Sequence, residues 1–99
     1  METFKDIING DKPVLVDFFA TWCGPCKAMS PIIESLGKDL QGQARILKID
    51  IDKNQALAAQ FHIQAVPTLM IFKKGEVVWR NSGGMDKVAL LQQTKSFID

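Results

Sequence analysis

The chain has few of the side chains that bind metals. Its 99 residues contain two cysteines and one histidine, His62. A closed structural zinc site needs four ligands, and Cys23, Cys26 and His62 supply at most three. We therefore predict no metal site. His62 stands alone after a short helical pattern, and we expect a surface or half-buried side chain there rather than a catalyst.

The chain also lacks an excess of one charge and a long hydrophobic run. Twelve basic and eleven acidic side chains leave a net charge of +1 at pH 7, which favours neither nucleic acid nor a membrane surface as a partner. No apolar run approaches the roughly 18 residues that span a membrane. Met1–Asp6 has no basic stretch followed by an apolar one, as a leader would. We expect a cytoplasmic monomer, or a secreted or periplasmic protein if a leader has been removed.

Length and hydrophobic periodicity predict a single domain over residues 1–99. A 46% hydrophobic and 23% charged composition is ordinary for a globular protein. The pattern alternates helices and strands, which predicts an α/β fold with helix-linked parallel strands and one antiparallel hairpin. The expected elements are a helix at Thr3–Asn9, a strand at Val14–Phe19, a helix at Cys23–Leu40, a strand at Ala44–Ile51, a helix at Gln55–Phe61, strands at Leu69–Phe72 and Val77–Arg80, and a last helix capped by Asp86 with a buried face of Leu90, Leu91, Thr94, Phe97 and Ile98.

The two cysteines lie three residues apart where a strand pattern gives way to a helix pattern. Residues i and i+3 share a helix face, so the two sulfurs can approach within bonding distance. A disulfide closing a loop of about four residues contributes roughly 2 kcal/mol, against roughly 5 for a 100-residue loop. Spacing therefore favours a redox pair, with an inert structural pair and a metal site as the alternatives.

The start of a helix suits the first cysteine to nucleophilic attack. Unpaired N–H groups and the helix dipole favour a thiolate at Cys23, which we expect to be the accessible nucleophile. Cys26, one turn deeper and buried, would then attack Cys23 and release the reduced partner. Gly24 and Pro25 supply the tight turn between them.

An acidic residue interrupts the strand that precedes the cysteines. Asp17 alternates with Leu15 and Phe19 in a run that is otherwise apolar on both faces, as in a central strand. Burial of an unpaired carboxylate is costly and raises its pKa. A partly solvated position at the end of the strand is the alternative reading.

The segment Phe19–Lys27, which includes Trp-Cys-Gly-Pro-Cys, closely resembles the active-site signature of the thioredoxin family. Further family residues occur at the expected separations: Asp17, Lys48, Val66-Pro67-Thr68, Gly75 and Gly83. The resemblance covers nearly all of the chain. It implies the thioredoxin fold, a three-layer α/β/α arrangement with a central mixed sheet, and a protein-disulfide reductase activity.

The resemblance also implies roles for individual residues. Asp17 would accept and return the proton of Cys26, with Lys48 as the partner of Asp17. The Val66–Pro67 bond would be cis and face the cysteines, and its backbone would pair with an extended substrate. Trp22, Val66, Pro67 and Gly83 would form the substrate-binding surface.

The chain departs from the family pattern in two places. It begins too late to hold the strand that usually precedes the first helix, so we expect four strands rather than five. Ala44–Ile51 would then be an edge strand, on which Arg45 and Lys48 discourage pairing with another chain. Phe19 stands where family members often carry tryptophan.

The family resemblance favours a dithiol reductant that needs no bound cofactor. Gly-Pro between the cysteines favours the reducing direction, and a thioredoxin reductase would supply electrons from NADPH. Two alternatives stay open: a redox-independent docking subunit that uses Trp22, Pro25, Val66 and Gly83, and a secreted disulfide exchanger. A docking role survives replacement of both cysteines by serine, whereas a redox role does not.

Overall fold

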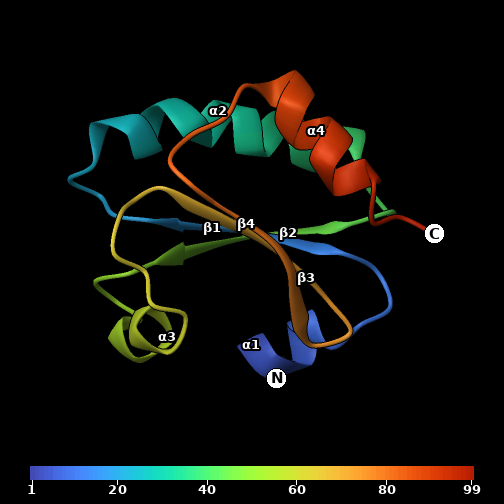
Figure 1. Cartoon of the computed structure of the whole chain (residues 1–99), viewed down its shortest axis with the longest axis horizontal. Helices are drawn as coiled ribbons and strands as arrows, with labels where there is room; N and C mark the ends of the chain where they lie inside the picture. The colour runs from blue at the N-terminus through green and yellow to red at the C-terminus, as the bar shows by residue number, and fades with distance from the viewer.

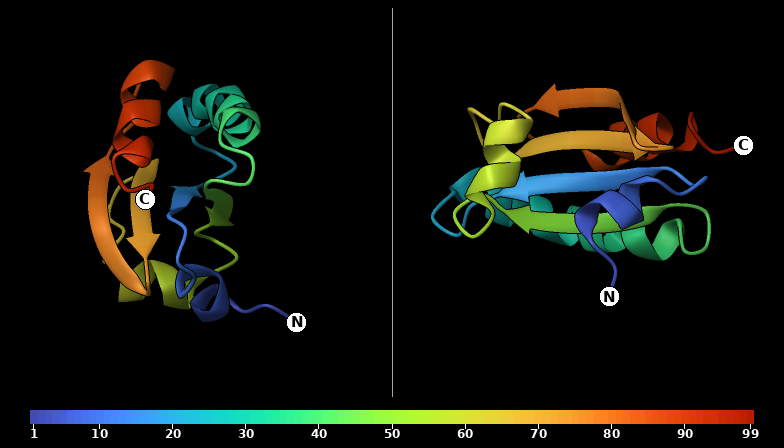
Figure 2. Two further views of the ribbon diagram at one scale, coloured as in Figure 1. Left: turned by 90° about the vertical axis from the view of Figure 1, so that its right-hand side faces the viewer. Right: turned by 90° about the horizontal axis from the view of Figure 1, so that it is seen from below.

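The computed structural model describes all 99 residues and contains one four-stranded sheet between two pairs of helices (Figure 1). Helices α2 and α4 cover one face of the sheet, and α1 and α3 cover the other, as the end-on view in Figure 2 also shows. The predicted three-layer α/β/α fold is therefore confirmed. In chain order the elements are α1 (Phe4–Ile8), β1 (Val14–Phe19), α2 (Gly24–Asp39), β2 (Arg45–Asp50), α3 (Gln55–Gln60), β3 (Thr68–Lys73), β4 (Glu76–Ser82) and α4 (Lys87–Lys95).

The sheet is mixed, with the strand order β2-β1-β3-β4. Strand β2 is parallel to β1, whereas β3 is antiparallel to both β1 and β4. The expectation of helix-linked strands that are all parallel is therefore wrong for β3. The 16 residues of α2 span about 24 Å and return the chain to the start of β2, but the six of α3 span only about 9 Å. Because α3 is too short to cross the sheet, β3 starts at the end where β2 finished.

Strand β1 lies inside the sheet because both of its faces are apolar. Leu15 belongs to a core cluster with residues of α2 and α4, and Val16 and Phe18 belong to a second cluster on the α1 side. All three side chains are fully buried. A strand covered by helices on both faces must be apolar throughout, which is why Asp17 stands out.

The long helix α2 begins at the cysteines and packs its apolar stripe on the sheet. Met29, Ile33 and Leu36 are buried, as the periodicity predicts, and Pro31 lies inside the helix. Helix α4 begins after Asp86, whose carboxylate accepts a hydrogen bond from the Ala89 amide at 2.9 Å. It ends at Lys95, so the expected face residues Phe97 and Ile98 follow the helix, where they pack half-buried against the core. No helix combines the length and hydrophobicity of a membrane-spanning segment.

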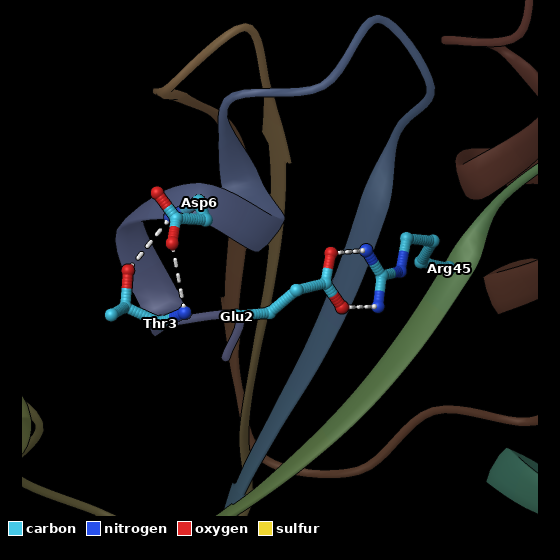
Figure 3. Close-up of polar contacts among 4 residues, drawn as sticks. All are labelled: Glu2, Thr3, Asp6 and Arg45. Atoms are coloured by element: carbon cyan, nitrogen blue, oxygen red, sulfur yellow. Dashed lines mark hydrogen bonds and ion pairs between the residues drawn. The ribbon is translucent and has the colours of Figure 1, made fainter.

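Strand β2 is an edge of the sheet, as expected for a chain with four strands. The N-terminal segment contacts this edge through Glu2, whose carboxylate accepts two hydrogen bonds from Arg45, each 2.9 Å long (Figure 3). Next to it, Thr3 and Asp6 form reciprocal hydrogen bonds of 3.1 and 3.0 Å that cap α1 (Figure 3). Arg45 is thus paired with Glu2 rather than being an unpaired charge on the edge strand.

Candidate functional site

The two cysteines lie where β1 passes into α2. Cys23 is the N-cap of the helix, and its Sγ accepts a hydrogen bond from the Cys26 amide at 3.2 Å. Cys23 and Cys26 form a disulfide with their Cα atoms 5.3 Å apart. An N-cap position gives the Cys23 sulfur both an N–H donor and the positive end of the helix dipole, and both favour a thiolate once the disulfide is opened.

Both cysteines are buried in this disulfide-bonded form. The exposed fraction is 5% for Cys23 and 3% for Cys26. The expectation of an accessible Cys23 thiol beside a buried Cys26 concerns the reduced protein and stays a prediction. The pair packs with Ala20 and is covered by the half-buried Val66. The contact of Val66 with Cys23, across 43 residues of sequence, agrees with the arrangement that the family resemblance implies.

The residues next to the buried cysteines in the sequence are exposed. Trp22 is 68% exposed, and Gly24 and Pro25 also face solvent. The Trp22 indole Nε1 donates a hydrogen bond of 2.9 Å to Asp52 in the turn after β2. Asp52 is a site residue that the sequence analysis missed, because no local pattern links it to a tryptophan 30 residues earlier. The contact fixes a large apolar ring on the surface beside Cys23.

The predicted substrate-binding residues meet at the same end of the sheet. The Val66–Pro67 peptide bond is cis, and the Val66 carbonyl oxygen lies 3.6 Å from Cys23 Sγ. The Gly83 amide donates a hydrogen bond of 2.7 Å to the Pro67 carbonyl. Gly83 has φ +98°, a conformation that favours glycine, and open space lies where a Cβ would stand. Val66, Pro67 and Gly83 therefore form a continuous backbone surface beside the disulfide.

Asp17 is fully buried, and neither oxygen of its carboxyl has a hydrogen-bond partner. Burial raises the pKa of Asp17 to about 6, and the Lys48 ammonium acts in the opposite direction. A buried carboxyl without a partner favours its neutral form. The prediction of a buried Asp17 with a raised pKa is thus confirmed, and the reading as a solvated strand end is wrong.

Lys48 is paired with Asp17 in the parallel register of β1 and β2, which places both on neighbouring strands as predicted. The Lys48 ammonium does not hydrogen-bond Asp17. It donates a hydrogen bond of 2.9 Å to Ser30 Oγ and lies 5.0 Å from the centre of the Phe19 ring. Lys48 thus acts on Asp17 through charge at a distance. Ser30 was missed by the sequence analysis, although it lies one helical turn after Cys26 and so on the same face.

A cavity of about 280 Å³ opens beside Cys26. Its wall comes from the end of β1, the first turns of α2 and the middle of β2; the lining residues are Phe19, Ala20, Thr21, Cys26, Lys27, Ser30 and Lys48. The cavity therefore reaches the second cysteine, and Val66 is not among its lining residues. No group of three or more histidine, cysteine, aspartate or glutamate side chains is arranged as metal ligands.

Comparisons with known proteins agree with this geometry. The family model described as Thioredoxin matches residues 1–96. The chain belongs to the thioredoxin family. A thioredoxin-like protein of Synechocystis is 48% identical over 96 residues, covering 96% of this chain and 91% of the relative. A solved structure of a mutant thioredoxin from Halobacterium salinarum superposes with a TM-score of 0.88 at 40% identity, covering 96% of this chain and 82% of that one.

A third relative joins the same domain to a second activity. The bifunctional thioredoxin reductase/thioredoxin of Mycobacterium leprae is 39% identical over 95 residues, which are 96% of this chain and 21% of that protein. Family membership and the Cys23–Cys26 disulfide together identify a thiol–disulfide oxidoreductase with protein-disulfide reductase activity. Its redox centre is the cysteine pair itself.

Proposed function

We propose that the chain transfers electrons to protein disulfides by thiol–disulfide exchange that starts at Cys23. The observation that carries this proposal is the N-cap position of Cys23, where the Cys26 amide donates to its sulfur. In the reduced protein the Cys23 thiolate attacks one sulfur of the partner's disulfide. A Cys23–partner disulfide forms, the partner's S–S bond breaks, and the second partner sulfur leaves as a thiolate.

Cys26 completes the exchange with help from Asp17. The Cys26 thiol gives its proton to the Asp17 carboxylate, and the resulting thiolate attacks Cys23 Sγ. The Cys23–Cys26 disulfide forms, and the partner leaves as a dithiol carrying two electrons. A carboxyl with a pKa of about 6 is a stronger base than an ordinary aspartate, and it still ionises at neutral pH. The return of the proton accompanies reduction of the disulfide.

Substrates dock on the backbone beside Cys23. An extended segment of the partner pairs with Val66 like an added strand, and it lies between the exposed Trp22 ring and Gly83. The open space at Gly83 leaves room for the substrate's backbone. Recognition through the backbone makes the site tolerant of the partner's sequence.

A thioredoxin reductase supplies the electrons from NADPH, so the chain needs no bound cofactor. The fusion of the two activities in the Mycobacterium leprae relative supports this partner. The chain then serves as a monomeric electron carrier in cell redox homeostasis. We place it in the cytoplasm, where a reducing environment keeps idle dithiols reduced.

A coupled assay tests this function. Catalytic amounts of the chain, a thioredoxin reductase, NADPH and insulin as a protein disulfide should give steady NADPH oxidation. Omitting either the reductase or the chain should stop it, as should the double variant Cys23→Ser/Cys26→Ser. NADPH oxidation at the same rate with and without the chain would contradict the proposal. A double variant that retains the cellular role would indicate redox-independent docking, and a chain that is oxidised at steady state in vivo would indicate an extracytoplasmic exchanger.

A further inference from the structure

The Lys48 side chain could extend into solvent or across the cavity, and its place on β2 does not determine which. Lys48 is exposed on the edge strand β2, so its ammonium can be fully hydrated on the outer side. It instead crosses the mouth of the cavity, over the Phe19 ring, to reach Ser30 on α2. A hydrogen bond of 2.9 Å between two side chains 18 residues apart is the single polar contact recorded for this ammonium.

Ser30 connects this ammonium to the redox pair. It lies four residues after Cys26 in α2, so the two side chains share the helix face that lines the cavity. Asp17 lies on the neighbouring strand at the register position of Lys48. We propose that Ser30 is a positioning residue: its hydroxyl holds the Lys48 ammonium at the cavity mouth, within electrostatic reach of Asp17 but out of contact with it.

The other neighbours of Asp17 leave Lys48 as the principal charge acting on it. From β3, the residue paired with Asp17 is the uncharged Leu69. From α2, Cys26 and the exposed Lys27 line the cavity, and Cys26 does not titrate in the disulfide. Lys48 is the cation that lowers the pKa of Asp17 against the effect of burial. The position of the Lys48 ammonium therefore determines how much of the rise caused by burial remains in the pKa of Asp17.

Removing the Ser30 hydroxyl has a predictable direction. A lysine ammonium released at an exposed position of an edge strand moves toward water, because dehydration of a charge is costly. Asp17 then loses part of the attraction that favours its charged form. The inference rests on the proposed function, since Asp17 is the acceptor of the Cys26 proton there; a higher Asp17 pKa moves the pH range of that transfer upward.

The test is a carboxyl NMR titration of Asp17 in the oxidised protein, where neither cysteine titrates. Ser30→Ala should raise the Asp17 midpoint by about half a pH unit. Ser30→Thr, which keeps the hydroxyl, should restore the wild-type midpoint. Lys48→Met should raise it at least as far, and adding Ser30→Ala to Lys48→Met should cause no further change. Alanine favours a helix interior, so a loss of folding is not expected to obscure the result.

Three results would overturn the inference: an unchanged midpoint in Ser30→Ala, a fall in that midpoint, or an equal rise when Lys48 is already methionine. The pH profile of insulin reduction then separates this inference from the proposed function. If the Asp17 midpoint rises and the low-pH limb of the rate follows it, both stand. If the midpoint rises and the rate profile does not move, Ser30 positions Lys48 but Asp17 is not the proton acceptor.

Discussion

The carboxyl groups of the N-terminal segment and of the redox end have opposite surroundings. Glu2 and Asp6 are exposed, and each accepts hydrogen bonds: Glu2 from Arg45, Asp6 from the Thr3 amide (Figure 3). The Arg45 guanidinium lowers the pKa of Glu2, and the Thr3 backbone lowers the pKa of Asp6. Asp17 is fully buried without a partner, and burial raises its pKa to about 6.

These opposite pKa shifts mean that ionised Glu2 and Asp6 stabilise the folded state, whereas ionised Asp17 destabilises it. A carboxylate with a lowered pKa favours the folded state at neutral pH, whereas one with a raised pKa opposes it. Natural sequences retain such costs mainly at functional sites. Asp17 lies in β1, the strand that leads to the redox pair, whereas Glu2 reaches Arg45 at the start of the neighbouring strand β2. Substitutions at the redox end should therefore change activity, and those at the N-terminal segment should change stability alone.

The largest expected effect comes from the cysteines. Cys23→Ser should abolish turnover, because no thiolate remains at the helix N-cap. Cys26→Ser should also abolish turnover but accumulate a disulfide between Cys23 and the partner, since the resolving thiol is missing. Non-reducing gels and mass mapping after incubation with oxidised insulin measure both. An adduct through Cys26 in the Cys23→Ser protein, with none in Cys26→Ser, would reverse the assigned roles.

Asp17→Asn should stabilise the oxidised protein at neutral pH. The folded pKa of about 6 exceeds the ordinary 3.8, so the folded state binds the extra proton and the ionised carboxylate destabilises the fold. This penalty is absent below about pH 4, grows as the pH rises, and is complete above about pH 6, where it amounts to about 3 kcal/mol. Urea unfolding at pH 3.5 and pH 7.5 measures it. Equal stabilities of the variant and the wild type at pH 7.5 would show that the charge is not destabilising.

Trp22→Ala should weaken partner binding more than it slows chemistry. The exposed ring beside Cys23 is fixed by Asp52, and its removal takes away apolar contact area. We expect KM for insulin to rise about fivefold, or about 1 kcal/mol, with kcat nearly unchanged. Asp52→Asn is the matched control, because it keeps an acceptor for the indole and should have a smaller effect. A fall in kcat with constant KM would assign Trp22 to the chemical step instead.

The smallest expected effect is that of Glu2→Gln. The Arg45 ion pair is exposed and screened by salt, so its loss should lower stability slightly at pH 7 and leave insulin reduction unchanged. Because the folded pKa of Glu2 lies below 4.5, this contribution exists above about pH 4.5 and disappears as the pH falls through the folded value. Unfolding in low and high salt measures it. An effect on the rate of insulin reduction would break the division between the two regions.

Much of the fold followed from local patterns in the sequence. The apolar run of β1 and the stripe of α2 predicted the layers correctly, and β2 is an edge strand, as expected for a four-stranded sheet. The predicted direction of β3 was wrong, although the predicted helix Gln55–Phe61 is nearly as short as the observed α3, Gln55–Gln60. A helix of this length is too short to return the chain across the sheet, so its predicted length already favours an antiparallel β3.

Two features of the site followed from the positions of single residues in the sequence pattern, namely Cys23 at the N-cap and Asp17 in a buried strand. The cis Val66–Pro67 bond agrees with what the family resemblance implies. The contacts of Ser30 with Lys48 and of Asp52 with Trp22 were not predicted. Their partners lie 18 and 30 residues apart, and such contacts depend on side-chain conformations that no periodicity reveals.

The pH dependence of the resolving step in Asp17→Asn tests most directly whether the buried carboxyl serves proton transfer. Stopped-flow mixing of the reduced protein with a labelled partner disulfide should show wild-type partner release that increases with pH through an inflection near 6. The variant should lose this inflection and release the partner at least about tenfold more slowly at pH 7, while the first attack by Cys23 stays fast. An unchanged pH–rate profile in Asp17→Asn would contradict the assignment of Asp17 as the acceptor of the Cys26 proton.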